Sequence, residues 1–212
     1  METIKPNQNS PLIRLISLAL EVWIKNKCID IESIKIRIKG SILKIIRGKI
    51  EGISLKASKV NFKEIHIDRI NILSDPIEIR SNKKNKQGLL KSQEFNIEGE
   101  LVLTEENINK IINSNTWKWV NRWLQENLLI SSEPYVIKIT EHSLLIKSIK
   151  LIETNQSQNE ILNFKVEKGS LFFKSIKDGK LKLLPMDPSI KITSMVIKRM
   201  KIYLNFESKV KI

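Results

Sequence analysis

Few side chains in this sequence could carry catalytic chemistry. Among the usual catalytic nucleophiles and bases, the candidates are Cys28, His66 and His142. His66 lies between Ile65 and Ile67, so strand alternation places it on the opposite face and predicts a surface histidine. The sequence contains no HExxH, GxSxG, GxxxxGK[ST] or GxGxxG motif. An enzyme is therefore the least supported class of protein, and we expect no catalytic residues and no cofactor.

Metal-ligand spacing is also missing from the sequence. A single cysteine allows neither an internal disulfide, nor a zinc cluster, nor a CxxC redox pair. The acidic residues are scattered, and the pair Glu105 and Glu106 is explained by the start of a helix. Asp30 and Glu32 fit the edge of a strand. We expect no metal site.

The chain is strongly basic, with a formal net charge of +14 at pH 7 and a pI near 9.8. A basic surface attracts the phosphates of nucleic acids and the headgroups of anionic lipids by the same long-range field. The chain is also rich in Ile, Lys and Asn and poor in Ala, a bias that AT-rich coding alone produces. Aromatic residues make up only 6% and mostly fall at apolar positions, which disfavours base stacking. A nucleic-acid-binding module and a membrane-associated assembly protein stay open as alternatives.

One segment is rich in tryptophan, TWKWVNRWLQENLL at residues 116–129. As a helix it has an apolar arc that covers about half its circumference. Indole rings prefer the membrane–water boundary, and neighbouring cations can meet lipid phosphates. The alternative is a helix that closes one end of the core. The predicted membrane contacts are Trp117, Trp119, Trp123, Lys118 and Arg122.

The amino-terminal part predicts a helix after a loose segment at residues 1–9. Ser10 and Pro11 form a helix start, and apolar residues then recur with helical spacing up to Ile24. We expect this helix to lie deep in the fold, with Arg14, Ser17, Glu21 and Lys25 at its polar margin. Residues 12–24 would span about 20 Å as a helix, short of the roughly 30 Å of a hydrocarbon core. With no signal peptide recognised, we expect a cytoplasmic protein or one peripheral on a membrane.

From Ile31 the apolar period changes to two, which predicts strands with one apolar and one charged face. The phase changes near residues 58–59 and 68–69, where we expect bulges, and Lys63-Glu64 fits a tight turn. Residues 43–46 are expected to continue a strand, and residues 81–94 to form an exposed loop. Bulges add bend and twist, so this ribbon is predicted to curve.

Later strands alternate in the same way, with turns at Lys168-Gly169 and Asp178-Gly179. Short helices are predicted after the cap at Thr104 and again over residues 116–129. The expected class is α+β, dominated by an antiparallel meander, with one domain over residues 10–212.

Three stretches carry a family resemblance: LIRLISLALEVWI, IIRGKIEGISLKASKVNFKEIHI and NIEGELVLTEENINKII, within residues 10–112. They resemble the LmeA-like phospholipid-binding family, whose pattern combines an RG-x-I-x-G-[VI]-S-L segment with a later V-x-G-E-L-x-L-[ST]-E-x-D-[LI]-N segment. Glu51 stands where proline is common, and Asn107 replaces an acid. The matching residues are Arg47, Gly48, Gly52, Ser54 and Leu55 in the first segment, and Gly99, Glu100, Leu101, Leu103, Thr104, Glu105, Asn107, Ile108 and Asn109 in the second.

The resemblance implies a tubular lipid-binding fold, a half barrel in which a long curved antiparallel sheet wraps around the amino-terminal helix, with lipid between them. It implies phospholipid binding and brings no catalytic residues. We therefore expect a lipid-binding or lipid-transfer protein whose partners are a phospholipid and an anionic membrane surface. The predicted cavity-lining residues are Leu15, Ile16, Leu20, Ile53, Leu55, Ile65, Ile67, Ile137, Ile139 and Leu144.

Overall fold

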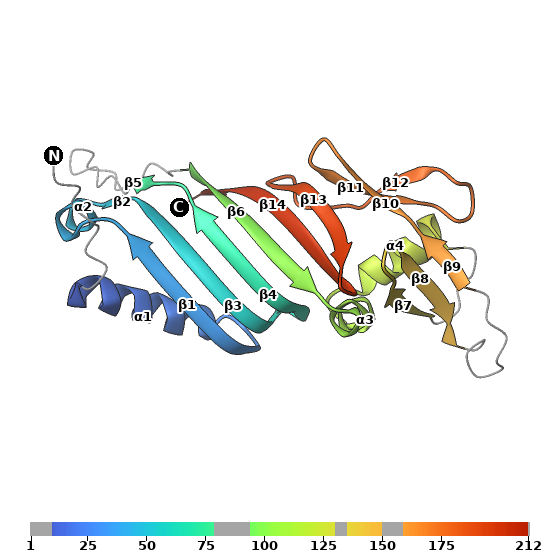
Figure 1. Cartoon of the computed structure of the whole chain (residues 1–212), viewed down its shortest axis with the longest axis horizontal. Coiled ribbons are helices and arrows are strands. Elements are labelled where there is room, and N and C mark those ends of the chain that lie inside the picture. The colour runs from blue at the N-terminus through green and yellow to red at the C-terminus, as the bar shows by residue number, and fades with distance from the viewer. Residues whose placement is uncertain (1–9, 79–93, 130–134, 150–158, 212) are drawn as a thin grey trace, which may run out of the picture.

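A computed structural model describes residues 10–78, 94–129, 135–149 and 159–211 and shows an α+β fold of antiparallel sheets (Figure 1). The described residues form the helices α1 (Pro11–Lys25), α2 (Ile42–Ile46), α3 (Glu105–Asn113) and α4 (Lys118–Asn127). The strands are β1 (Asp30–Lys39), β2 (Lys49–Ile50), β3 (Gly52–Phe62), β4 (Ile65–Ser74), β5 (Ile77–Glu78), β6 (Glu94–Leu103), β7 (Tyr135–Ile139), β8 (Leu144–Ser148), β9 (Asn159–Leu162), β10 (Phe164–Glu167), β11 (Ser170–Lys174), β12 (Leu181–Leu183), β13 (Ile190–Lys198) and β14 (Lys201–Lys211).

The largest sheet has six antiparallel strands in the order β1-β3-β4-β6-β14-β13. Its first and last strands do not pair with each other, so the sheet stays open. Three smaller sheets have the orders β10-β11-β12, β7-β8-β9 and β2-β5. Figure 1 shows α1 and α2 at one end of the elongated molecule, and α3, α4 and the two three-stranded sheets at the other.

The expectation that the amino-terminal helix lies deep in the fold was wrong, because α1 packs on the edge strand β1 and leaves Leu15, Val22 and Trp23 more than half exposed. Ile13, Ile16 and Leu20 pack on β1 and the neighbouring part of β3. The predicted polar margin of the helix was wrong in part: Ser17 is buried, and Glu21 accepts a 2.8 Å hydrogen bond from the Ile36 amide. Glu21 turns inward because an edge strand leaves backbone amides without a neighbouring strand.

The predicted phase changes occur where expected, but no residue is inserted into a single strand. The pairing of β1 with β3 and of β3 with β4 keeps one register throughout. In each of β1, β3 and β4, one pair of neighbouring inward-facing residues is separated by two residues, where regular alternation would leave one. The separating residues are Glu32 and Ser33 in β1, Ser58 and Lys59 in β3, and Asp68 and Arg69 in β4. Lys59 has a φ of 49° at this point. The three strands therefore exchange their inward and outward faces at the same level of the sheet. We call this shared change of face the concerted break.

Most predicted turns are confirmed. Lys63 and Glu64 both have positive φ, as two-residue turns between twisted antiparallel strands require, and Lys168-Gly169 and the β11–β12 connection at Asp178-Gly179 agree. Arg199 and Met200 form a further turn of this kind that the sequence reading missed. Residues 43–46 are not a strand but belong to α2, because the Ser41 hydroxyl caps a short helix there. Most of the predicted loop at residues 81–94 lies outside the described residues.

Helices α3 and α4 confirm the two predicted later helices. Thr104 accepts from the Asn107 amide while the Asn107 side chain accepts from the Thr104 amide, which is a reciprocal capping box. Asn109 on α3 then bonds the backbone of β7, accepting from the Ile137 amide at 2.9 Å and donating to the Ile137 carbonyl at 2.7 Å. Glu105 accepts from the Ile139 amide at 3.0 Å. Side chains on one face of α3 thus make the hydrogen bonds to the β7 backbone that a neighbouring strand would otherwise make.

Among the described residues, most buried apolar side chains form three clusters, and Ile77 and Val102 are buried outside them. The cluster under α1 contains Ile13, Ile36 and Ile38. A second, at the concerted break, contains Ala57, Val60 and Ile67. The largest lies at the other end of the molecule, where α3, α4 and the small sheets pack against β13 and β14, and it includes Leu128, Leu129, Ile139, Leu162, Ile192 and Ile202.

Candidate functional site

The large sheet carries a continuous apolar face across all six strands. Strand register aligns two cross-strand rows on this face. One row consists of Ile36, Leu55, Ile72, Gly99, Phe206 and Ile192. The next consists of Ile34, Ala57, Ile70, Leu101, Leu204 and Met195.

The opposite face of the same strands is polar. Its rows are Arg37, Ser54, Leu73, Glu98, Glu207 and Lys191, and then Lys35, Lys56, Asn71, Glu100 and Asn205. Because neighbouring residues of a strand point to opposite faces, the two faces differ in chemistry although they share every strand. The apolar side chains of these rows are therefore gathered on one face of the sheet.

Packing covers the apolar face unevenly. Helix α1 covers it over β1 and part of β3, and the largest cluster covers it over β13 and the adjacent part of β14. Between these two covers lie half-buried apolar side chains that belong to none of the three clusters. We call them the open strip: Ile72 on β4, Phe95 and Ile97 on β6, and Val210 on β14.

Gly99 lies beside the open strip and leaves room for an aromatic ring. A Cβ atom at this position would lie 2.5 Å from Cζ and 2.7 Å from Cε1 of Phe206, and 3.0 Å from the Asn71 carbonyl oxygen. Real side chains do not approach so closely, so the ring occupies the volume that any other residue would need. Phe206 in turn contacts the largest cluster, and its ring therefore forms the boundary between that cluster and the open strip.

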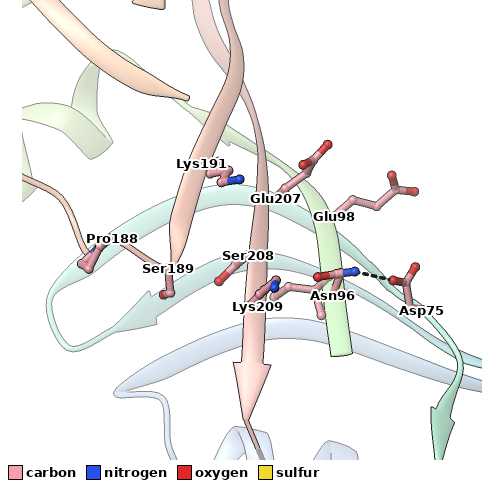
Figure 2. Close-up of a pocket in the computed structure, with 10 residues that line it drawn as sticks. Asp75, Asn96, Glu98, Pro188, Ser189, Lys191, Glu207, Ser208 and Lys209 are labelled. Carbon is pink, nitrogen blue, oxygen red and sulfur yellow. Dashed lines mark hydrogen bonds between the residues drawn. The ribbon is translucent and has the colours of Figure 1, made fainter. Parts of the chain in front are cut away.

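A polar pocket of about 560 Å³ lies at the end of the sheet where Ile97 is found, but its lining residues Glu98, Glu207 and Lys191 belong to the polar face, opposite the open strip (Figure 2). Figure 2 shows it at one end of β6, β13 and β14, with Asn96 donating a 2.8 Å hydrogen bond to Asp75. Cationic and acidic side chains both line it. The polar lining residues are Asp75, Asn96, Glu98, Ser189, Lys191, Glu207, Ser208 and Lys209.

The predicted cavity-lining residues lie in three separate places. Ile16, Leu20, Ile53 and Leu55 meet in the cluster under α1, close to the strip. Ile65 and Ile67 lie in the cluster at the concerted break. Ile137, Ile139 and Leu144 are at most 3% exposed inside the largest cluster. Leu15 is 64% exposed and points away from the sheet.

The tryptophans of α4 have different surroundings. Trp117 donates from Nε1 to the Lys63 carbonyl at 2.8 Å, which ties α4 to the β3–β4 turn. The Trp123 ring packs edge-on against Phe173, 6.3 Å between centroids, at the surface of the largest cluster. Trp119 is 41% exposed, and the cationic residues Lys118 and Arg122 are exposed.

The residues singled out for chemistry do not converge on one site. His66 lies half-buried in a separate polar groove of about 590 Å³ with Asp30 and Glu105. Burial raises the pKa of the Cys28 thiol, which disfavours the nucleophilic thiolate. Among the described residues no three His, Cys, Asp or Glu side chains gather as metal ligands.

Comparison with family models identifies the family of the chain. A model of the LmeA-like phospholipid-binding family matches residues 13–202. The chain belongs to the LmeA-like phospholipid-binding family. Searches of curated proteins and of solved structures each found no match. Within the described part of this LmeA-like chain, no helix has both the length and the apolar character to cross a membrane.

The second LmeA-like motif has a structural role at each of several positions. Gly99 makes room for Phe206, Thr104 and Asn107 cap α3, and Asn109 holds β7. The first motif encloses a tight corner: Gly48 has a φ of 76°, and a Cβ atom on Gly52 would lie 3.2 Å from the Ser74 carbonyl oxygen. Arg47 is exposed at the end of α2, whereas Ser54 and Glu100 lie on the polar face of the sheet.

Proposed function

We propose that this protein is a non-enzymatic phospholipid-binding protein that acts at a membrane surface and holds acyl chains against the open strip. The observation that carries the proposal is the apolar face that crosses six strands and holds, in the described part of the chain, the half-buried side chains of the open strip outside the three clusters. Membership of the LmeA-like phospholipid-binding family supports the ligand class. The open strip then serves as the floor of the ligand site.

Burial of an acyl chain on the strip supplies part of the free energy that binding needs. Each methylene moved from water onto the strip contributes about 0.8 kcal/mol. About ten methylenes would give roughly 8 kcal/mol, which is comparable with the estimated 4–15 kcal/mol cost of association. A stable complex therefore needs contacts beyond the strip. Ser208 alternates with Phe206 and Val210 along β14 and so shares their face, which makes its hydroxyl available to a headgroup.

The predicted lining residues keep distinct places in this proposal. Ile16, Leu20, Ile53 and Leu55 would form the wall nearest α1, and Ile65 with Ile67 would extend the floor past the concerted break. Ile137, Ile139 and Leu144 would reach an acyl chain only if the largest cluster opened, because they are buried within it. Leu15 has no place in this site, because it is 64% exposed and points away from the sheet.

Lipid extraction from gently purified protein, followed by mass spectrometry, tests the proposal. Ile72→Trp should fill the strip and lower the molar ratio of bound phospholipid severalfold, because Ile72 lies in the uncovered part of the apolar face. Leu73→Trp is the matched control, since Leu73 is the next residue on β4 but points to the polar face and is 44% exposed. Absence of co-purifying lipid in the wild type, or equal loss in both variants, would contradict the proposal.

A further inference from the structure

Helix α1 has a second apolar face that points away from the sheet. We define the outer face of α1 as Leu12, Leu15, Leu18, Val22 and Trp23, with exposed fractions between 40% and 64%. At 100° per residue these five side chains share one arc of the helix. The arc that packs on β1 is opposite and contains Ile13, Ser17 and Leu20. The outer face therefore takes no part in the packing of α1 on β1.

The charges around the outer face have one sign. Glu21, the one acidic residue of α1, points inward to the Ile36 amide. Arg14 and Lys25 lie beside the outer face, and neither forms an ion pair with another residue in the described part of the chain. Because the helix hides its carboxylate and exposes its cations, the outer face combines apolar side chains with positive charge.

Helix α2 extends this chemistry at the same end of the molecule. Its Ile45 packs against the cluster under α1, which places α2 at the same end of the large sheet as α1. Leu43 and Ile46 are 68% and 69% exposed, and Arg47 follows directly. Figure 1 shows both helices at the β1 end of the large sheet, far from α4.

We propose that the outer face of α1, assisted by α2, docks the protein onto a bilayer that contains anionic phospholipid. An interfacial helix needs an exposed apolar face with cations beside it, and α1 has both. The same arrangement matches a lipid surface by charge, since anionic headgroups attract Arg14 and Lys25 while the apolar side chains enter the acyl boundary. Trp23 suits this boundary because its indole is amphipathic.

This inference rests on the proposed function for the class of partner, and it assigns docking to α1 where the sequence alone pointed to α4. In α4, Trp117 is held by the Lys63 carbonyl and Trp123 by Phe173. Trp119 is left as the exposed tryptophan of that helix, at 41%. The outer face of α1 offers five large exposed side chains in one arc.

Vesicle flotation of the full-length protein tests the inference, with phosphatidylcholine vesicles that contain or lack phosphatidylserine. The triple variant Leu15→Gln, Leu18→Gln and Val22→Gln should lose about tenfold or more of its binding to anionic vesicles. The matched control Leu73→Gln, Val196→Gln and Met200→Gln removes apolar side chains of comparable exposure from β4, β13 and the β13–β14 turn, and should bind as the wild type does. Circular dichroism checks that both variants fold.

The charge contribution has its own pair of variants. Arg14→Gln with Lys25→Gln should weaken binding to anionic vesicles and leave binding to neutral vesicles unchanged. Lys118→Gln with Arg122→Gln on α4 removes the same charge and should have little effect. If the α4 pair weakens binding and the α1 pair does not, the assignment to α1 is overturned.

Two further readouts separate this inference from its rivals. Co-purified phospholipid should be unchanged in the α1 triple variant, so loss of docking with lipid retained identifies a surface role distinct from the ligand site. If the wild-type protein carries no co-purified lipid but still docks through α1, the carrier function is refuted and the docking inference is supported. If sedimentation shows that the triple variant converts a dimer to a monomer while vesicle binding is unchanged, the outer face joins two copies of the chain and the inference fails.

Discussion

Gly99 provides a sharp test of the packing beside the open strip. In Gly99→Ala the new Cβ would lie 2.5 Å from the Phe206 ring and 3.0 Å from the Asn71 carbonyl oxygen. The ring can move only by leaving its contacts with the largest cluster, and the backbone carbonyl cannot move without disturbing β4. Overpacking of this kind costs about 1–3 kcal/mol of unfolding free energy.

The sign of the effect is informative because Gly→Ala in a strand otherwise stabilises. The intrinsic gain is roughly 0.5–1 kcal/mol, since alanine has less conformational entropy to lose on folding. For a chain of this size, a net loss of about 1–2 kcal/mol should lower the melting temperature by about 2–8 °C. Thermal unfolding followed by circular dichroism measures this shift, and urea unfolding gives the free energy itself.

A double-mutant cycle identifies the ring as the cause. In the background of Phe206→Leu, which removes the ring atoms nearest Gly99, the cost of Gly99→Ala should fall by at least about 1 kcal/mol. The residual cost then reports the contact with the Asn71 carbonyl. The proposed packing of Phe206 over Gly99 would be refuted if Gly99→Ala alone is neutral or stabilising. It would also be refuted if the cost of Gly99→Ala is the same with Phe206 and with Leu at position 206.

Further predictions concern the capping box, the α3–β7 contact and the ion pairs that Asp68 forms with Lys59 and Lys201. Thr104→Ala should lower stability by about 1 kcal/mol in urea unfolding, because the first turn of α3 loses its side-chain cap. Asn109→Ala should cost about 2 kcal/mol, because the Ile137 amide and carbonyl lose their partner, whereas Asn113→Ala, one turn later and exposed, should cost much less. Hydrogen bonds from Lys201 and Lys59 lower the pKa of Asp68, so its stabilising contribution is present above the unfolded carboxyl pKa of about 3.9 and is lost as pH falls toward the lower folded value. Asp68→Asn should therefore lower the free energy of unfolding near neutral pH and make that free energy fall less steeply below about pH 4. An unchanged dependence of the unfolding free energy on pH below about 4 would contradict this role.

The sequence predicts most strands and turns because alternation and turn chemistry are local. Helix α2 was mistaken for a strand because a short apolar run has no period of its own, and the Ser41 cap decided its form. The inward position of Glu21 on α1 was missed because the edge amide of β1 attracts a carboxylate, which periodicity does not report. Local pattern thus specifies elements better than it specifies which face of an element is buried.

The candidate site needed information that the sequence does not carry. Ile72 and Ile97 were recognisable as apolar strand positions, but their place between two covers depends on strand order and on where α1 and the small sheets pack. Gly99 offered a usable signal, since a glycine within an alternating strand indicates close approach by another group. The separation of the predicted lining residues into three clusters follows from tertiary packing alone.

The concerted break across β1, β3 and β4 constrains how this sheet can change in evolution. Insertion of one residue on either side of Lys59 would move half of β3 out of step with two neighbours at once. A tolerated length change at that place would need matching insertions in all three segments, which single events do not supply. Related chains should therefore vary in length at the hairpin tips while this stretch keeps its spacing, and grafting one of these strands alone into a flat sheet should fail.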